Sequence, residues 1–163
     1  MTEITETQPR YTTISQMDEE FAQLEYTATV FPEGFFHGRI LAFGGPGFLL
    51  APLQLPASAI DGINPWRGKS FWGDRGANRW ISDSRDAHYG HFRVEIGKSV
   101  LDGRKTLLLD YDVPENPALL RRILGEARQI PGAYLCRMLY RTGAAPLELL
   151  YFTLKKETQV SLP

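Results

Sequence analysis

The sequence contains one cysteine, Cys136, among 163 residues. A single thiol excludes an internal disulfide. The chain also lacks an apolar run of about 18 residues or more and a recognisable secretion signal. We therefore expect a cytoplasmic protein with no membrane partner. Cys136 alternates with Tyr134, Met138 and Tyr140, and a free cysteine in such a strand-like run is usually a small buried hydrophobe.

Net charge is nearly absent, because the formal charge is -1. Without a broad basic surface we expect no nucleic-acid partner. The sequence also lacks a nucleophile elbow, a G-x-G-x-x-G turn after a strand and a metal-spaced cysteine set. His88 and His91 lie close in sequence but lack enough further ligands, and "GGPG" at 44–47 lacks the Lys-Ser/Thr of a phosphate loop. We expect no metal site and no cofactor.

The length and the 43% content of hydrophobic residues indicate one globular domain. We expect a flexible N-terminal arm over residues 1–13, one domain over 14–157 and a C-terminal tail over 158–163. A short amphipathic helix is predicted to begin near Ser15, which has Asp18 three positions on as a variant capping box. Met17, Phe21 and Leu24 would form its apolar stripe.

Most of the chain has the pattern of antiparallel strands. Glycines and prolines between residues 32 and 59 break any long period, so strands with tight turns are expected there. Residues 91–112 predict a hairpin, in which Phe92, Val94 and Ile96 alternate with polar residues and Asp102-Gly103 forms a two-residue turn. Residues 133–141 and 147–156 predict a second hairpin.

A second helix is predicted before that last hairpin. Asn116 is a suitable N-cap, Pro117 suits the first helical position, and Pro131-Gly132 would end the helix. An apolar stripe would leave Glu126 and Arg128 facing water. It consists of Leu119, Leu120, Ile123, Leu124, Ala127 and Ile130.

These elements together predict a mainly β fold. We expect an antiparallel β-barrel with a short N-terminal helix and one helix before the last two strands, because closure removes exposed sheet edges. An open α+β antiparallel sheet is the alternative.

The candidate binding residues centre on residues 63–80, a stretch that holds all three tryptophans and several cations. Rings and cations together suit an amphipathic acid. Alternatively, Trp66 and Phe71 fill the barrel and "GDRGANR" is a solvated loop. Phe36, Trp66, Arg67, Lys69, Phe71, Trp72, Trp80, Tyr134 and Tyr140 are the predicted ligand-binding residues.

Asp110 and Tyr111 are the candidate catalytic residues. On a strand they point to opposite faces, so only one of them can face the interior. An inward Asp110 would have a raised pKa and suit acid-base chemistry, whereas an inward Tyr111 could donate a hydrogen bond to a carbonyl. In the simpler arrangement Tyr111 faces the core and Asp110 pairs with an arginine.

Several segments resemble the GXWXG-motif proteins. "GFFHG" at 34–38 is similar to their G-x-W-x-G motif, with Phe36 where the family has Trp. "PWRGKSF" is similar to their W-[YF]-G-K-x-F segment at Trp66, Gly68, Lys69 and Phe71. "LLLDYDVPENPALLRRI" and "LLYFTLKK" resemble later segments of that family. The resemblance implies a calycin-like, lipocalin-like barrel, compatible with a small-molecule cavity, and implies no reaction.

Three functions fit these observations. The first is a barrel that binds a small apolar or amphipathic molecule, which predicts a ligand-sized cavity. The second is a cofactor-independent isomerase or cyclase, which predicts an inward ionisable group with a perturbed pKa. The third is a packed scaffold that forms a homodimer through Trp72 or Trp80, which predicts no cavity.

Overall fold

Regular structure begins with the helix α1 (Ile14–Ala22). The computed structural model describes residues 13–44, 66–80 and 90–158. The predicted arm except Thr13, most of the predicted tail, "GGPG" beyond Gly44 and His88 therefore lie outside the described residues. Thr13 and Gln16 form a reciprocal capping box. The predicted helix is confirmed, but its cap precedes Ser15. Met17 and Phe21 are its buried residues.

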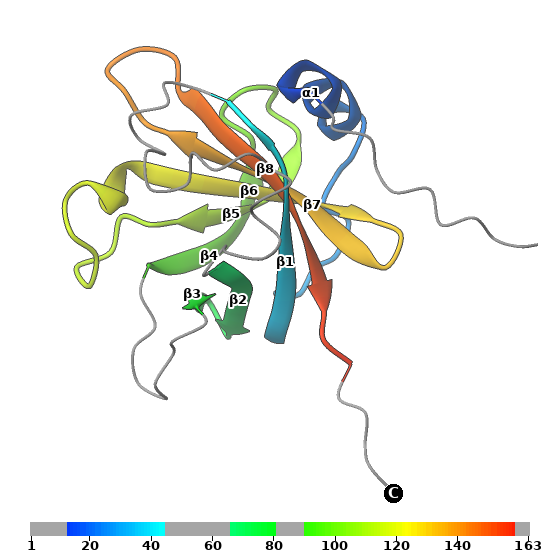
Figure 1. Cartoon of the computed structure of the whole chain (residues 1–163), viewed down its shortest axis with the longest axis vertical. Coiled ribbons are helices and arrows are strands. Elements are labelled where there is room, and N and C mark those ends of the chain that lie inside the picture. Colours follow the sequence, from blue (N-terminus) through cyan, green and yellow to red (C-terminus); the bar gives the residue numbers. More distant parts are fainter. Residues whose placement is uncertain (1–12, 45–65, 81–89, 159–163) are drawn as a thin grey trace, which may run out of the picture.

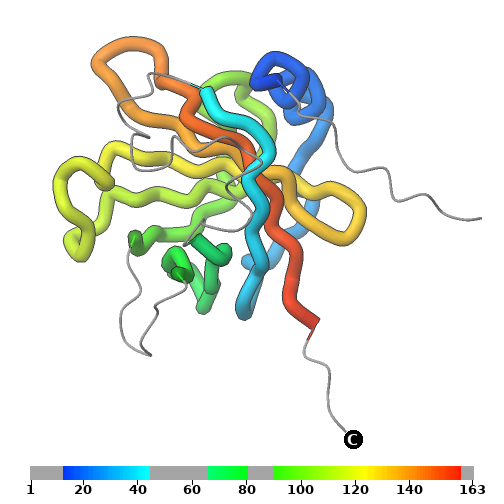
Figure 2. The backbone as a smooth tube through the Cα atoms, in the orientation of Figure 1, coloured from blue at the N-terminus to red at the C-terminus, as the bar shows by residue number. Residues whose placement is uncertain are grey.

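The described strands form one closed antiparallel barrel. Each strand pairs with the next in sequence, and β8 pairs with β1 to close the sheet, as Figures 1 and 2 show. The predicted barrel is confirmed and the open sheet is excluded. The strands are β1 (Gly34–Phe43), β2 (Trp66–Trp72), β3 (Arg75–Trp80), β4 (His91–Lys98), β5 (Lys105–Asp110), β6 (Ile123–Ile130), β7 (Ala133–Tyr140) and β8 (Leu147–Lys156).

Both predicted hairpins are present. Strands β4 and β5 pair as far as Lys98 and Lys105, and β7 pairs with β8. The turn of the first hairpin is longer than predicted, because Ser99 donates its backbone N–H to the Arg104 carbonyl beyond it. Gly103 supplies the positive φ of +70° that this longer turn requires.

The predicted helix before the last two strands is wrong. Residues 120–122 form only the 3₁₀ turn η2 (Leu120–Arg122), and the strand β6 follows. Strand β6 pairs with β5 on one side and along its whole length with β7 on the other. It is buried on both faces, so its apolar residues do not alternate and resemble a helical stripe. The ladder bonds to both neighbours decide the strand conformation over local propensity.

Apolar residues gather on both sides of the sheet. One cluster lies inside the barrel and includes Phe36, Phe92 and Phe152. A second cluster lies outside, where α1 contacts β1 and β8 (Figure 1). Phe21 of α1 meets Tyr151 of β8 there in an edge-to-face contact. The helix therefore covers the outside of the barrel wall.

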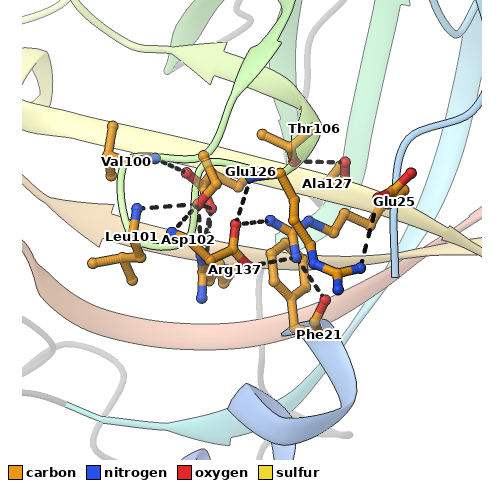
Figure 3. A network of polar contacts seen from close by, with 12 residues as sticks. Phe21, Glu25, Val100, Leu101, Asp102, Thr106, Glu126, Ala127 and Arg137 are labelled. Carbon is orange, nitrogen blue, oxygen red and sulfur yellow. Dashed lines mark hydrogen bonds and ion pairs between the residues drawn. The ribbon is translucent and has the colours of Figure 1, made fainter. Parts of the chain in front are cut away.

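A buried polar network accounts for the charges of β6 (Figure 3). The Glu126 carboxylate accepts hydrogen bonds from Ser99 and Val100 of the β4–β5 turn and from Arg137 of β7. Arg128 donates to both carboxylate oxygens of Asp102, at 2.6 and 2.8 Å. Glu126 and Arg128 are fully buried, so the prediction that they face water is wrong. Pairing compensates their loss of hydration.

Candidate ligand pocket

A β-bulge in β2 turns two side chains into the barrel. In a regular strand Trp66 and Lys69 would face opposite sides, because they are three residues apart. The register with β3 skips Arg67, since Trp66 pairs with Trp80 and Gly68 pairs with Arg79. The extra residue reverses the alternation. Both Trp66 and Lys69 consequently line the same internal pocket.

Glycines in β1 and β2 permit this arrangement. Gly68 has a φ of +142°, and a Cβ there would lie 2.0 Å from the carbonyl oxygen of Phe36. A Cβ at Gly38 would lie 2.2 Å from the Trp66 ring. The segments "GFFHG" and "WRGK" therefore meet as neighbouring strands, with the indole seated over a glycine.

Lys69 is the central polar group of the barrel interior. Its side chain is 2% exposed, and Nζ donates hydrogen bonds to Asn78 Oδ1 at 2.6 Å and to Tyr111 Oη at 2.5 Å. Four rings lie 5.2 to 5.7 Å from Nζ. Within the described residues, no carboxylate forms an ion pair with it. The rings belong to Trp66, Phe92, Tyr111 and Phe152.

Burial changes the protonation of this group of residues. Desolvation lowers the pKa of Lys69 from 10.5 to about 7, and the nearby Cys136 thiol opposes the shift only in part. The same desolvation raises the pKa of Tyr111 and the pKa of Cys136 well above their usual values. The site therefore holds a protonated phenol and a protonated thiol beside an amine that can be neutral near neutral pH.

The pocket lies inside the barrel, toward the end at which β2 begins and β3 ends. Its volume is about 120 Å³. The Trp66 indole meets Phe152 edge to face and donates to Asn78 at 3.3 Å. Apolar side chains form nearly all of the wall. The lining residues are Ile40, Trp66, Lys69, Asn78, Trp80, Met138, Leu150 and Phe152.

Only part of the predicted binding set lines this pocket. Trp66, Lys69 and Trp80 line it. Phe36 and Phe71 are buried in the core cluster, in edge-to-face contact with each other.

The remaining predicted residues lie elsewhere. Arg67 occupies the bulge and is exposed, and Trp72 is 41% exposed at the end of β2. Tyr134 stacks on Tyr26. Tyr140 ends β7, where it pairs with Ile123 and Leu147.

The side chains of Asp110 and Tyr111 have different surroundings, as the simpler arrangement predicts. Tyr111 is buried in the core, whereas Asp110 forms ion pairs with Arg141 at 3.1 Å and Arg93 at 3.4 Å. Partial desolvation alone would raise the pKa of Asp110, but the Asp112 N–H, Arg141 and Arg93 outweigh it and the pKa is lowered. An ionised, paired carboxylate of this kind is a poor general acid.

Sequence reasoning missed Asn78, which links the polar groups of the pocket. Its Oδ1 accepts hydrogen bonds from Lys69, Trp66 and Tyr111. The "GDRGANR" segment is not a solvated loop, because it forms the β2–β3 turn and the strand β3. The alternation of Gly76, Asn78 and Trp80 was the sequence signal that could have indicated strand β3 and placed Asn78 on the same face as Trp80. The other missed lining residues are Ile40, Met138, Leu150 and Phe152.

In the part of the chain that the structure describes, the fold and the pocket define a closed eight-stranded antiparallel barrel with a buried lysine inside. Comparison with protein-family models, curated proteins and solved structures found no match to this chain. In the described residues, no group of three or more His, Cys, Asp or Glu side chains is placed to hold a metal ion. No helix within the described ranges is long and apolar enough to cross a membrane.

Proposed function

We propose that this protein binds a small apolar or amphipathic molecule inside its barrel. One observation carries the proposal: a cavity of about 120 Å³ has an apolar wall that is interrupted by Lys69 and Asn78. Binding sites for small molecules commonly combine such a wall with a few polar groups that orient the ligand.

The volume limits the size of the ligand. An apolar protein cavity of about 150 Å³ accommodates benzene, so a cavity of about 120 Å³ limits the ligand to a compound no larger than about one ring or a short acyl chain. The rings of Trp66, Trp80 and Phe152 provide flat surfaces against which such a compound can pack.

The polar residues favour a ligand with an oxygen at one end. With a pKa of about 7, Lys69 can present either an ammonium or an amine near neutral pH. The ammonium would attract a carboxylate, and the amine could donate a hydrogen bond to a carbonyl or hydroxyl oxygen. The Asn78 side chain, which faces Lys69 across the two strands, adds a second polar group.

The cavity favours ligand binding over a packed scaffold, for which we expected none. The homodimer stays a prediction, with the exposed Trp72 as its candidate contact. A cofactor-independent isomerase or cyclase is the second candidate function. It is supported by the inward ionisable groups, Lys69 and Tyr111, rather than by Asp110.

Nuclear magnetic resonance of the indole N–H groups tests the binding proposal. Benzyl alcohol and benzoate, one neutral and one anionic probe, would be titrated into the protein. We expect saturable shifts of the Trp66 and Trp80 signals, because both rings line the pocket. Trp72 is an internal control, because it does not line the pocket.

Two variants on β8 make the test specific. Leu150→Phe adds volume inside the pocket, whereas Leu147→Phe makes the same change at a partly exposed position outside it. We expect Leu150→Phe to weaken binding and Leu147→Phe to retain it. The absence of saturable shifts with both probes, or equal binding by the two variants, would overturn the proposal.

A further inference from the structure

We propose that Lys69 is a nucleophilic amine that condenses reversibly with a small aldehyde or ketone held in the pocket, forming an imine. The inference rests on the proposed function, because the carbonyl compound must enter the same cavity. It deepens that function by naming a substrate class.

The geometry around Nζ is suited to attack on a carbonyl carbon. Lys69 lines the cavity, and its nitrogen donates to Asn78 and Tyr111. A neutral amine has two N–H hydrogens, which these two acceptors can take, and one lone pair. With both hydrogens engaged, the lone pair is the part of the amine left to react. The pocket wall beside it is apolar, so an entering carbonyl group would meet little competing water.

The charge state agrees with this role. Burial lowers the pKa of Lys69 to about 7, and desolvation in an apolar pocket is an established way of activating a lysine amine. The surrounding rings favour the ammonium through cation–π attraction. Within the described residues, however, no carboxylate pairs with the ammonium. The remaining lysines, Lys98, Lys105, Lys155 and Lys156, are exposed.

The reaction is balanced without an oxidant or reductant. The nitrogen lone pair forms a C–N bond, the π electrons of the carbonyl move to oxygen, and a proton passes from nitrogen to that oxygen to give a carbinolamine. The C–O bond then breaks, nitrogen loses its second proton, and water leaves as the C=N bond forms. Tyr111 retains its phenolic proton because desolvation raises its pKa. Its Oη lies 2.5 Å from Nζ, within hydrogen-bond reach of the departing oxygen.

Reductive trapping tests the inference on the full chain. The protein would be incubated with a limiting amount of benzaldehyde at about pH 8, reduced with borohydride and mapped by peptide mass spectrometry. At that pH the neutral fraction of an amine with a pKa of about 7 is roughly two- to three-hundredfold larger than that of an ordinary lysine. We expect one benzyl group per chain, on Lys69, and protection of Lys69 by excess benzyl alcohol.

Variants provide the matched control. Lys69→Met should abolish the trapped product, whereas Lys98→Met, which removes an exposed lysine, should leave it unchanged. Site mapping in the unaltered protein gives the same answer without a variant, so misfolding of Lys69→Met would not prevent a decision.

The outcomes separate the two proposals. Benzaldehyde on exposed lysines alone, with benzyl alcohol still shifting the Trp66 signal, overturns imine formation and leaves ligand binding intact. Failure of both probes overturns both proposals. Selective trapping at Lys69 supports both.

Discussion

The Trp66 indole lies directly over Gly38, so closely that a Cβ at Gly38 would be 2.2 Å from the ring. This contact joins β1 to β2 and fixes one wall of the pocket. Any side chain at position 38 must therefore move the indole. Because the same indole donates to Asn78, its displacement would also disturb the polar groups around Lys69.

Gly38→Ala should lower the free energy of unfolding by about 1 to 3 kcal/mol, the usual cost of overpacking. It should also weaken benzyl alcohol binding, because the displaced ring enters or opens the pocket. Urea unfolding and the indole titration measure the two effects. Gly143→Ala is the control, since a Cβ there meets no atom within 4 Å. Equal stability of the two variants would contradict the contact.

Lys69→Met should change how stability depends on pH. Between pH 7 and 10.5 the unfolded chain holds a proton on Lys69 that the folded protein lacks, so the free energy of unfolding rises with pH in this window. Below pH 7 both states are protonated, and the full cost of burying the ammonium is present.

Urea unfolding across this pH range measures the effect. As pH rises, the free energy of unfolding of the unaltered protein should increase relative to that of Lys69→Met, by at most about 1.4 kcal/mol per pH unit. Lys98→Met, which removes an exposed lysine, is the matched control. Parallel curves for the unaltered protein and Lys69→Met would mean that Lys69 stays protonated in the fold.

Glu126→Gln should destabilise the fold strongly. It leaves the buried Arg137 without its closest counter-charge, at 2.7 Å, and breaking a buried pair costs about 3 to 5 kcal/mol. Glu148 lies 3.6 Å from the same guanidinium and compensates part of its charge. We therefore expect a cost at the lower end of that range.

Glu115→Gln is the matched control. It removes a carboxylate from a half-exposed pair with Arg75 at 3.8 Å and should cost about 0 to 1 kcal/mol. Urea unfolding compares the two variants. A loss in Glu126→Gln no larger than in the control would show that the buried network contributes little to stability.

Glu148→Gln should reduce the pH dependence of stability at acidic pH. Desolvation and a hydrogen bond with the negatively charged Asp18 raise the pKa of Glu148 from 4.5 to about 7. The folded protein thus holds a proton that the unfolded chain loses between pH 4.5 and 7, and stability falls as pH rises through this window. The midpoint temperature of thermal unfolding should therefore change less with pH in this window for Glu148→Gln than for the unaltered protein. An unchanged pH profile would contradict the raised pKa.

The barrel was predictable because most strands have one face toward the core. Phe92, Val94 and Ile96 alternate with polar neighbours on β4, and the period alone identifies the strand. Strand β6 was not predictable in this way, because the barrel core covers one of its faces and the buried polar network around Glu126 and Arg128 covers the other. A strand buried on both sides has no alternation to detect.

The site was predictable only in its composition. The concentration of rings and cations in residues 63–80 pointed to Trp66, Lys69 and Trp80, which do line the pocket. The position of Asn78 opposite Lys69 depends on strand register, and the inward turn of Lys69 depends on a bulge. Neither appears in the residue pattern of one strand.

The bulge at Arg67 controls which chemistry the interior contains. Without the bulge, β2 would alternate regularly from Trp66, so that Ser70 would take the inward position and the side chain of Lys69 would face outward. The composition of the barrel wall would hardly change, and its overall shape could survive. Whether the barrel interior contains an amine therefore depends on how the backbone of β2 accommodates Arg67, and not only on which side chains the strand carries.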